Sequence, residues 1–186
     1  MKKILFLFFL SVMSLVSKAQ TELEPQLKVS YELGVDEDKN QSYGGELVVG
    51  YRMSDDFRLG AGAGIYWCKH LYEKSHYNSL INYYSKEYKE TASYIPLFVN
   101  GKYNFVATGE LRPYLSVDLG YSIFNSASSY ADDNEMGVFV KPAFGVDYSI
   151  GEGTLFFEVG YKYQDRKFQE VKMGYSQLTI SVGYQF

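Results

Sequence analysis

The sequence is poor in cysteine, proline and histidine: its 186 residues include one Cys, four Pro and two His. A single Cys excludes an internal disulfide framework. The 18 basic residues are outnumbered by 22 acidic ones and form no arginine-rich stripe, which excludes a basic nucleic-acid-binding module. The only long apolar run covers residues 4–16, so most of the chain must fold by some means other than membrane helices.

Aromatic residues and glycine are abundant, with 19 Tyr, 13 Phe and 17 Gly. An aromatic content of 18% allows the chain to bury far more surface than a disordered protein does. The length fits one domain. We therefore expect an ordered, single-domain protein.

The first nineteen residues have the order of a secretory signal. Lys2 and Lys3 precede the apolar run 4–16, and Ser17-Lys18-Ala19 places small residues at positions −3 and −1 of a cleavage site. The 13-residue run is short for a membrane span, so a retained N-terminal anchor is the weaker alternative. We expect residues 1–19 to be a signal peptide and residues 20–186 to form the exported domain.

From residue 27 onward, apolar side chains recur at every second position, as in Leu27–Val35 and Leu178–Phe186. A period of two predicts β-strands, and eight such segments are present. Long gaps (36–42, 69–91, 125–136, 165–174) alternate with short gaps of turn-forming residues (54–56, 107–110, 151–153). This predicts an all-β, antiparallel up-and-down meander with both termini at the tight-turn end. Pro142 lies inside the sixth segment, where we expect a later strand start or a bulge.

The alternation by itself does not show whether the apolar face of the sheet points inward or outward. A soluble binding barrel has its apolar side chains inside, and a membrane barrel has them outside. Here the polar positions carry both signs of charge, together with most of the strand glycines, which make room for long side chains. The charged residues on this parity are Lys28, Glu32, Glu46, Arg52, Arg58, Lys102, Arg112, Asp118, Lys141, Asp147, Glu158 and Lys162. We expect them to form a lumen charge network.

Aromatic side chains form two bands on the apolar parity. Tyr51, Phe57, Tyr103, Phe105, Tyr148, Tyr184 and Phe186 lie near the tight turns; Tyr43, Trp67, Tyr121, Tyr161 and Tyr163 lie near the long loops. Two aromatic girdles around an aliphatic middle are typical of the two membrane–water interfaces. The pattern therefore favours an eight-stranded antiparallel transmembrane β-barrel, with side chains filling its interior.

With these features the chain resembles the small eight-stranded outer-membrane barrels of Gram-negative bacteria, namely the OmpX-like proteins and the barrel domain of OmpA-like proteins. The resemblance implies an outer-membrane location and contact with lipid and lipopolysaccharide. It also implies that the ending Val182-Gly183-Tyr184-Gln185-Phe186, above all Tyr184 and Phe186, is an assembly signal for the barrel-insertion machinery. The resemblance concerns the barrel and not the periplasmic wall-binding domain of OmpA-like proteins, so we do not expect a wall-tethering role.

Some barrels of this size are enzymes that deacylate or acylate lipid A. His70 and His76 are the only histidines, and both lie in the gap 69–91 with Ser75, Ser79 and Glu73. They lack the Ser/His arrangement on a strand that such an enzyme needs, so we predict no catalytic residues. Neither acidic cluster, 36–38 or 132–135, has calcium-loop spacing, and Cys68 has no partner cysteine, so no metal or cofactor is predicted.

The gap 69–91 has the composition of a recognition surface, because tyrosine offers contact area at low entropic cost. Its candidate binding residues are Tyr72, Tyr77, Tyr83, Tyr84 and Tyr88. We expect a monomer that acts in envelope integrity, adhesion or binding of an extracellular protein or glycan. The alternatives are a lipid-modifying enzyme, a small-solute pore, and a soluble periplasmic binder with the opposite face wet.

Overall fold

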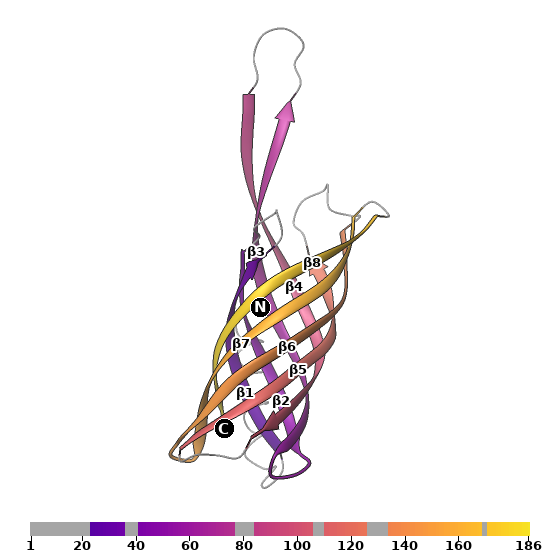
Figure 1. The fold of residues 1–186 in the computed structure, drawn as a ribbon. Helices are drawn as coiled ribbons and strands as arrows, with labels where there is room; N and C mark the ends of the chain where they lie inside the picture. Colours follow the sequence, from indigo (N-terminus) through magenta and orange to yellow (C-terminus); the bar gives the residue numbers. More distant parts are fainter. Residues whose placement is uncertain (1–22, 36–40, 77–83, 106–109, 126–133, 169–170) are drawn as a thin grey trace, which may run out of the picture.

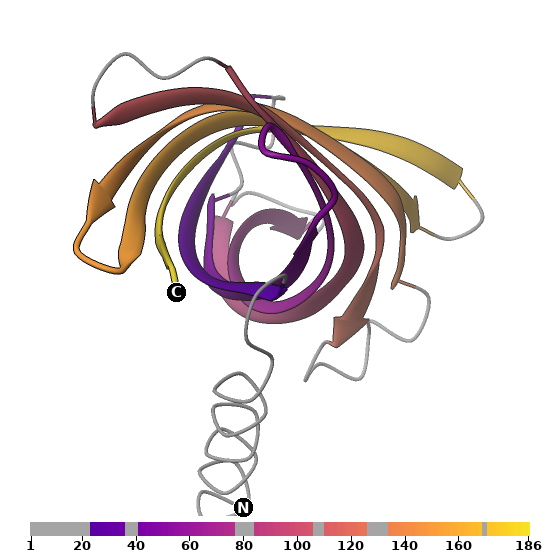
Figure 2. The same ribbon diagram turned by 90° about the horizontal axis from the view of Figure 1, so that it is seen from below.

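Eight antiparallel strands close into a barrel in the computed structural model, which describes residues 23–35, 41–76, 84–105, 110–125, 134–168 and 171–186. The strands are β1 (Leu23–Gly34), β2 (Gln41–Arg52), β3 (Phe57–His76), β4 (Tyr84–Asn104), β5 (Leu111–Asn125), β6 (Asn134–Ile150), β7 (Gly153–Phe168) and β8 (Val171–Gln185). Each strand pairs with its neighbour in sequence, and β8 pairs with β1. Seen from below, the strands curve around a common axis (Figures 1 and 2). The predicted fold class is confirmed.

Tight turns join the strands at one end of the barrel. In the β2–β3 turn the amide of Met53 donates to the carbonyl of Phe57 at 2.9 Å, and the Phe57 amide donates to Ser54 Oγ at 3.0 Å. The β6–β7 turn contains only Gly151 and Glu152, and Gly151 has the left-handed φ of 61° that glycine adopts at little cost. The chain ends at this same end, where the Phe186 amide donates to the carbonyl of Pro25 at 3.0 Å.

The strands extend further than the sequence pattern predicts at the opposite end. The segment 69–91, expected as a loop, is mostly the continuation of β3 and β4, which pair from Lys69↔Thr91 to His76↔Tyr84. Likewise β7 and β8 pair as far as Phe168↔Val171, across most of the expected loop 165–174. The expectation was wrong because alternation marks only strand segments with one apolar face, and backbone pairing between two strands does not require that pattern.

Pro142 causes neither of the expected irregularities. Strand β6 begins earlier than expected, at Asn134, and its register shift against β7 lies between Met136 and Phe139. Pro142 itself is a register partner of Val117 on β5, with its side chain on the outer face. The bulge therefore lies nearer the long-loop end than the proline does.

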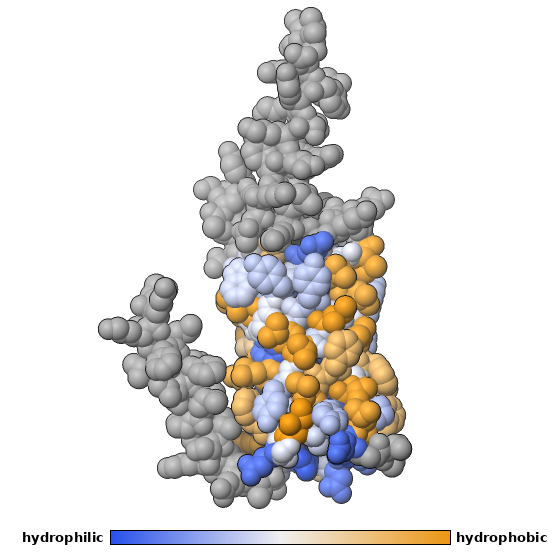
Figure 3. All heavy atoms as spheres, turned by 90° about the vertical axis from the view of Figure 1, so that its left-hand side faces the viewer, coloured by the Kyte–Doolittle hydropathy of each residue, from blue (hydrophilic) through white to orange (hydrophobic). Residues whose placement is uncertain are grey.

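The outer surface of the barrel is apolar. Leu119 is 56% exposed and Val49 37%, and other large apolar side chains on the same parity are similarly exposed. Most charged side chains on the other parity are buried. On the face drawn in Figure 3, apolar residues cover a broad band, and polar residues gather below it at the tight-turn end. A water-coated exterior around an oily cavity, the soluble alternative, does not fit this surface. Among the described residues no helix is long and apolar enough to cross a membrane.

Aromatic rings, exposed or half-buried, lie at both edges of the apolar band. Tyr43 and Trp67 stack at 5.9 Å near the long-loop end. At the tight-turn end Tyr184 and Phe186 meet edge-on at 5.0 Å, and Tyr103 and Phe105 do so at 5.5 Å. These are the two aromatic bands that the sequence predicts.

Candidate functional site

Aromatic rings and glycines share the interior of the barrel with the charged residues. Phe98, Phe139 and Val48 form one buried cluster, and Tyr66 and Tyr94 stack at 5.0 Å in another. A Cβ added to Gly62 would overlap the ring of Phe98, and one added to Gly145 would overlap the ring of Tyr114. The lumen glycines thus make room chiefly for rings. The prediction of a charge network was incomplete in this respect, because aromatic rings fill much of the same space.

The middle of the lumen holds a cluster of two lysines and three carboxylates. Lys28 Nζ lies 2.7 Å from Glu46 and 3.5 Å from both Asp118 and Glu158. Lys141 Nζ lies 2.7 Å from Asp118 and 3.3 Å from Glu46. Because these five residues come from β1, β2, β5, β6 and β7, they connect opposite walls of the barrel.

Nearer the long-loop end, Lys162, Glu32 and Tyr94 form a smaller buried cluster. The Lys162 ammonium lies 3.2 Å from Glu32 and donates to the Tyr94 hydroxyl at 2.9 Å. The Tyr94 hydroxyl in turn donates to Glu32. The same ammonium lies 4.5 Å from the centroid of the Tyr94 ring, an additional cation–π contact.

Toward the tight turns lie two further buried cations, Lys102 and Arg58. Lys102 Nζ is 2.7 Å from the Asp147 carboxylate, which also accepts a hydrogen bond from the side-chain amide of Asn104 at 2.7 Å. Arg58 donates to three amide oxygens: Gln26 at 2.8 Å, Asn100 at 3.1 Å and Gln185 at 3.3 Å.

Two residues expected in the lumen network lie instead at its rim. The Arg52 side chain is 54% exposed and pairs with Glu24, and that of Arg112 is 38% exposed and lies 3.4 Å from Asp56. Both occupy strand ends beside tight turns, where the inward parity opens to solvent. The remaining charged residues predicted for the lumen are buried.

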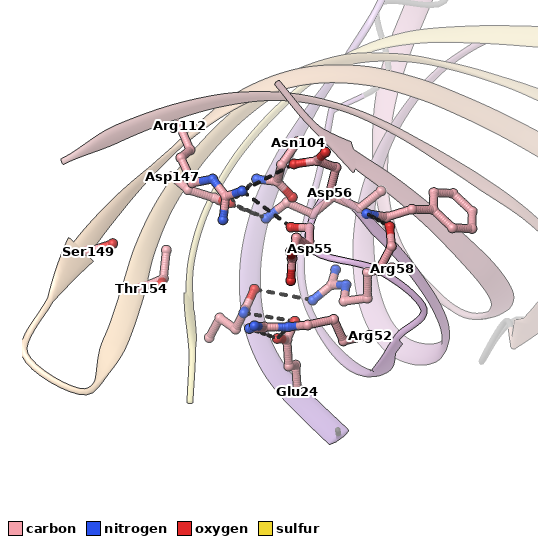
Figure 4. A pocket seen from close by; sticks show the side chains of 14 residues that line it. Glu24, Arg52, Asp55, Asp56, Arg58, Asn104, Arg112, Asp147, Ser149 and Thr154 are labelled. Carbon is pink, nitrogen blue, oxygen red and sulfur yellow. Dashed lines mark hydrogen bonds and ion pairs between the residues drawn. The ribbon is translucent and has the colours of Figure 1, made fainter. Parts of the chain in front are cut away.

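A cavity of about 80 Å³ opens between these rim pairs at the tight-turn end. Arg52 and Arg58 reach it from the β2–β3 hairpin, Arg112 and Asp147 from β5 and β6, and Ser149 and Thr154 from the β6–β7 hairpin (Figure 4). All of its lining residues except Phe57 are polar or charged. The sequence contained no signal for this cavity, because its lining comes from strand ends far apart in the chain.

Three of the five predicted binding tyrosines lie on the projecting β3–β4 hairpin. Tyr72 and Tyr88 are register partners, and Tyr84 is the partner of His76. Tyr77 and Tyr83 lie outside the described residues. His70 and His76 are six positions apart on the same strand, about 20 Å at the usual rise of a strand, so they do not share one site.

Comparisons with known proteins agree with this architecture. A family model described as outer membrane protein beta-barrel domain matches residues 4–186. The solved structure of neisserial surface protein A aligns with a TM-score of 0.62 at 14% identity, over 89% of this chain and 96% of that one. AlkL, solved in DMPC lipid bilayers, aligns with a TM-score of 0.51 at 13% identity, over 90% of each chain. At these identities the likeness concerns the fold alone. No curated protein matches the sequence.

Proposed function

Because this chain belongs to the outer membrane protein beta-barrel domain family, we propose that it works at the cell surface by contact, through the projecting β3–β4 hairpin. The protein is an integral outer-membrane barrel. The contact would serve adhesion, envelope integrity or capture of an extracellular protein or glycan. In barrels of this class short turns face the periplasm and long connections face outward, which directs the hairpin away from the cell.

The observation that carries this proposal is the length of the hairpin beyond the rest of the barrel. The last partner of β3 on β2 is Lys69, opposite Gln41, and the last partner of β4 on β5 is Ser93, opposite Asn125. Beyond these positions, within the described residues, His70–His76 pairs with Tyr84–Glu90 and with no other strand. Seven residues of strand extend about 23 Å, so the hairpin rises well above the barrel (Figure 1).

Two features of the hairpin suit recognition. Both of its outer edges lack a neighbouring strand among the described residues, and open edges are able to pair with an extended segment of another molecule. Its sequence interleaves tyrosines with lysines, a composition that provides contact area and charge together.

The filled interior supports contact rather than transport. Rings and ion-paired side chains from opposite walls meet in the middle of the lumen, as expected for a barrel of eight strands. A lipid-modifying enzyme and a soluble binder have no comparable observation in their favour.

The direct test is to remove the hairpin without disturbing the barrel. Leu71 and Lys89 are register partners, so residues 72–88 can be replaced by an Asn-Gly turn that keeps the strands in register. We expect heat-modifiable migration on gels to persist and binding of expressing cells to host cells, matrix or glycan surfaces to be lost.

A second variant distinguishes binding by the tyrosine side chains from binding by the hairpin backbone. Replacing Tyr72, Tyr77, Tyr83, Tyr84 and Tyr88 with Ser keeps the chain length and should weaken binding if the rings make the contact. Unchanged binding after the 72–88 replacement would contradict the proposal. Mass spectrometry of lipid A from cells with and without the protein then tests for a lipid-modifying enzyme.

A further inference from the structure

Among the described residues, one buried cation of the lumen differs from the others in lacking a carboxylate partner. Lys28, Lys102 and Lys141 each have a carboxylate oxygen at 2.7 Å, and Lys162 has one at 3.2 Å. Arg58 is only 4% exposed, yet no carboxylate oxygen in the described part of the chain lies within ion-pair distance of its guanidinium. A buried charge without a counter-charge is costly, so this position calls for an anion.

Four carboxylates near Arg58 are engaged elsewhere, and a fifth, Asp55, belongs to an exposed turn. Asp147 is held by Lys102, Glu24 by Arg52, and Asp56 by Arg112. Asp118 lies beyond Asn100 and is paired with Lys141 and Lys28. Asp55 lines the same cavity from the exposed β2–β3 turn.

The donors of Arg58 are only partly used. Its two terminal nitrogens donate to the amide oxygens of Gln26, Asn100 and Gln185, which fix the plane of the guanidinium. Its buried Nε has no hydrogen-bond partner within the segments that the structure describes. Gly50 gives the side chain its space, because a Cβ there would come within 2.8 Å of that Nε. The guanidinium is therefore positioned but incompletely satisfied.

Arg58 also lines the cavity at the tight-turn end (Figure 4). Since one water needs roughly 10–15 Å³ of such space, the 80 Å³ available is enough for an ion of several heavy atoms. The hydroxyls of Ser149 and Thr154 on the far wall provide further donors.

We propose that this cavity binds a phosphate group from the periplasmic side, with Arg58 as its anchor. A planar guanidinium that has a free N–H and no carboxylate partner among the described residues suits the oxygens of phosphate. The phosphate would be either the free ion or a small phosphate ester resembling a lipid headgroup. This inference does not depend on the hairpin, which lies at the opposite end of the barrel.

The test uses the purified full-length barrel in a non-ionic detergent free of phospholipid. Inorganic phosphate and glycerol 3-phosphate are titrated separately by calorimetry at constant ionic strength. We expect saturable binding of at least one probe, and Arg58→Gln should weaken it at least about tenfold. Binding of inorganic phosphate indicates the free ion as the source; binding of the ester alone indicates a headgroup.

Arg166→Gln is the matched control, because it makes the same charge change on β7 at the other end of the barrel, where Arg166 is the register partner of Met173. Its affinity should equal that of the wild type. Equal weakening by both substitutions, or no saturable binding of either probe to the wild type, overturns the proposal. If Arg58→Gln fails to fold, Gly50→Ala displaces the arginine instead and should lower the affinity in the same way.

Discussion

At the scale of single residues, the lumen combines buried charges with glycines that face bulky side chains. The charges form local groups: Lys28 and Lys141 share Glu46 and Asp118. Lys102 and Lys162 each pair with one carboxylate, so the loss of either lysine leaves that carboxylate buried and uncompensated. The glycines matter because they have no Cβ: rings or long side chains from neighbouring strands occupy the space that a methyl group would need.

The pair Lys162–Glu32 provides a test of this view. Lys162→Met should lower the free energy of unfolding by about 3–5 kcal/mol, because the Glu32 carboxylate remains buried without its cation. The double variant Lys162→Met, Glu32→Gln should recover most of that loss. Urea unfolding in lipid or detergent measures both, and an unaltered midpoint for the single variant would show that Glu32 reaches solvent.

The glycines provide a second test with an internal control. Gly62→Ala should destabilise the barrel by about 1–3 kcal/mol, because the added Cβ would overlap the Phe98 ring. Gly101→Ala should have little effect, since no described atom lies within 4 Å of a Cβ at that position. Equal unfolding midpoints for the two variants would mean that the lumen is more loosely filled than the structure indicates.

At the scale of elements, β3 and β4 each belong partly to the closed barrel and partly to the projecting hairpin. Their lower parts belong to a closed sheet, in which every strand has two neighbours. Their upper parts form a two-stranded hairpin, and such hairpins are only marginally stable in water.

Hydrogen–deuterium exchange should therefore change along a single strand. We expect amides in His70–His76 and Tyr84–Glu90 to exchange much faster than those in Phe57–Tyr66 and Tyr94–Asn104, because opening the hairpin disrupts no barrel contact. Peptide-resolved mass spectrometry on the protein in lipid nanodiscs makes the measurement. Uniform protection along β3 would indicate that another part of the chain or a partner covers the hairpin.

At the scale of the whole molecule, closure of β8 onto β1 decides both the apolar exterior and the filled interior. Closure leaves no unpaired strand edge in the membrane-spanning part, which a membrane requires. It also brings Lys28 and Glu158, 130 residues apart in sequence, to 3.5 Å across the interior.

Because the interior is filled, we expect the barrel to conduct no measurable ion current. Purified wild-type protein in planar bilayers should produce no stable conductance steps, because ion-paired side chains from facing walls close the middle of the lumen. A porin inserted under the same conditions serves as the positive control. Reproducible steps from the wild-type barrel would instead favour the small-solute pore.

The sequence by itself determined the strand number, the alternation of faces, the tight turns and the apolar exterior. The strand number and the alternation of faces follow from a local period of two that any single strand displays without its partners, and the tight turns follow from short gaps of turn-forming residues. The apolar exterior follows instead from the mixed charges on the polar parity and from the two aromatic bands on the apolar parity. The alternation also predicts which positions of each strand carry the buried charges, from Lys28 on β1 to Lys162 on β7. Only the tertiary structure decided which of these charges meet, how far β3 and β4 continue past the apolar band, and that Arg58 has no carboxylate partner among the described residues. Those outcomes depend on the register between strands and on closure across the lumen, which join residues far apart in the chain.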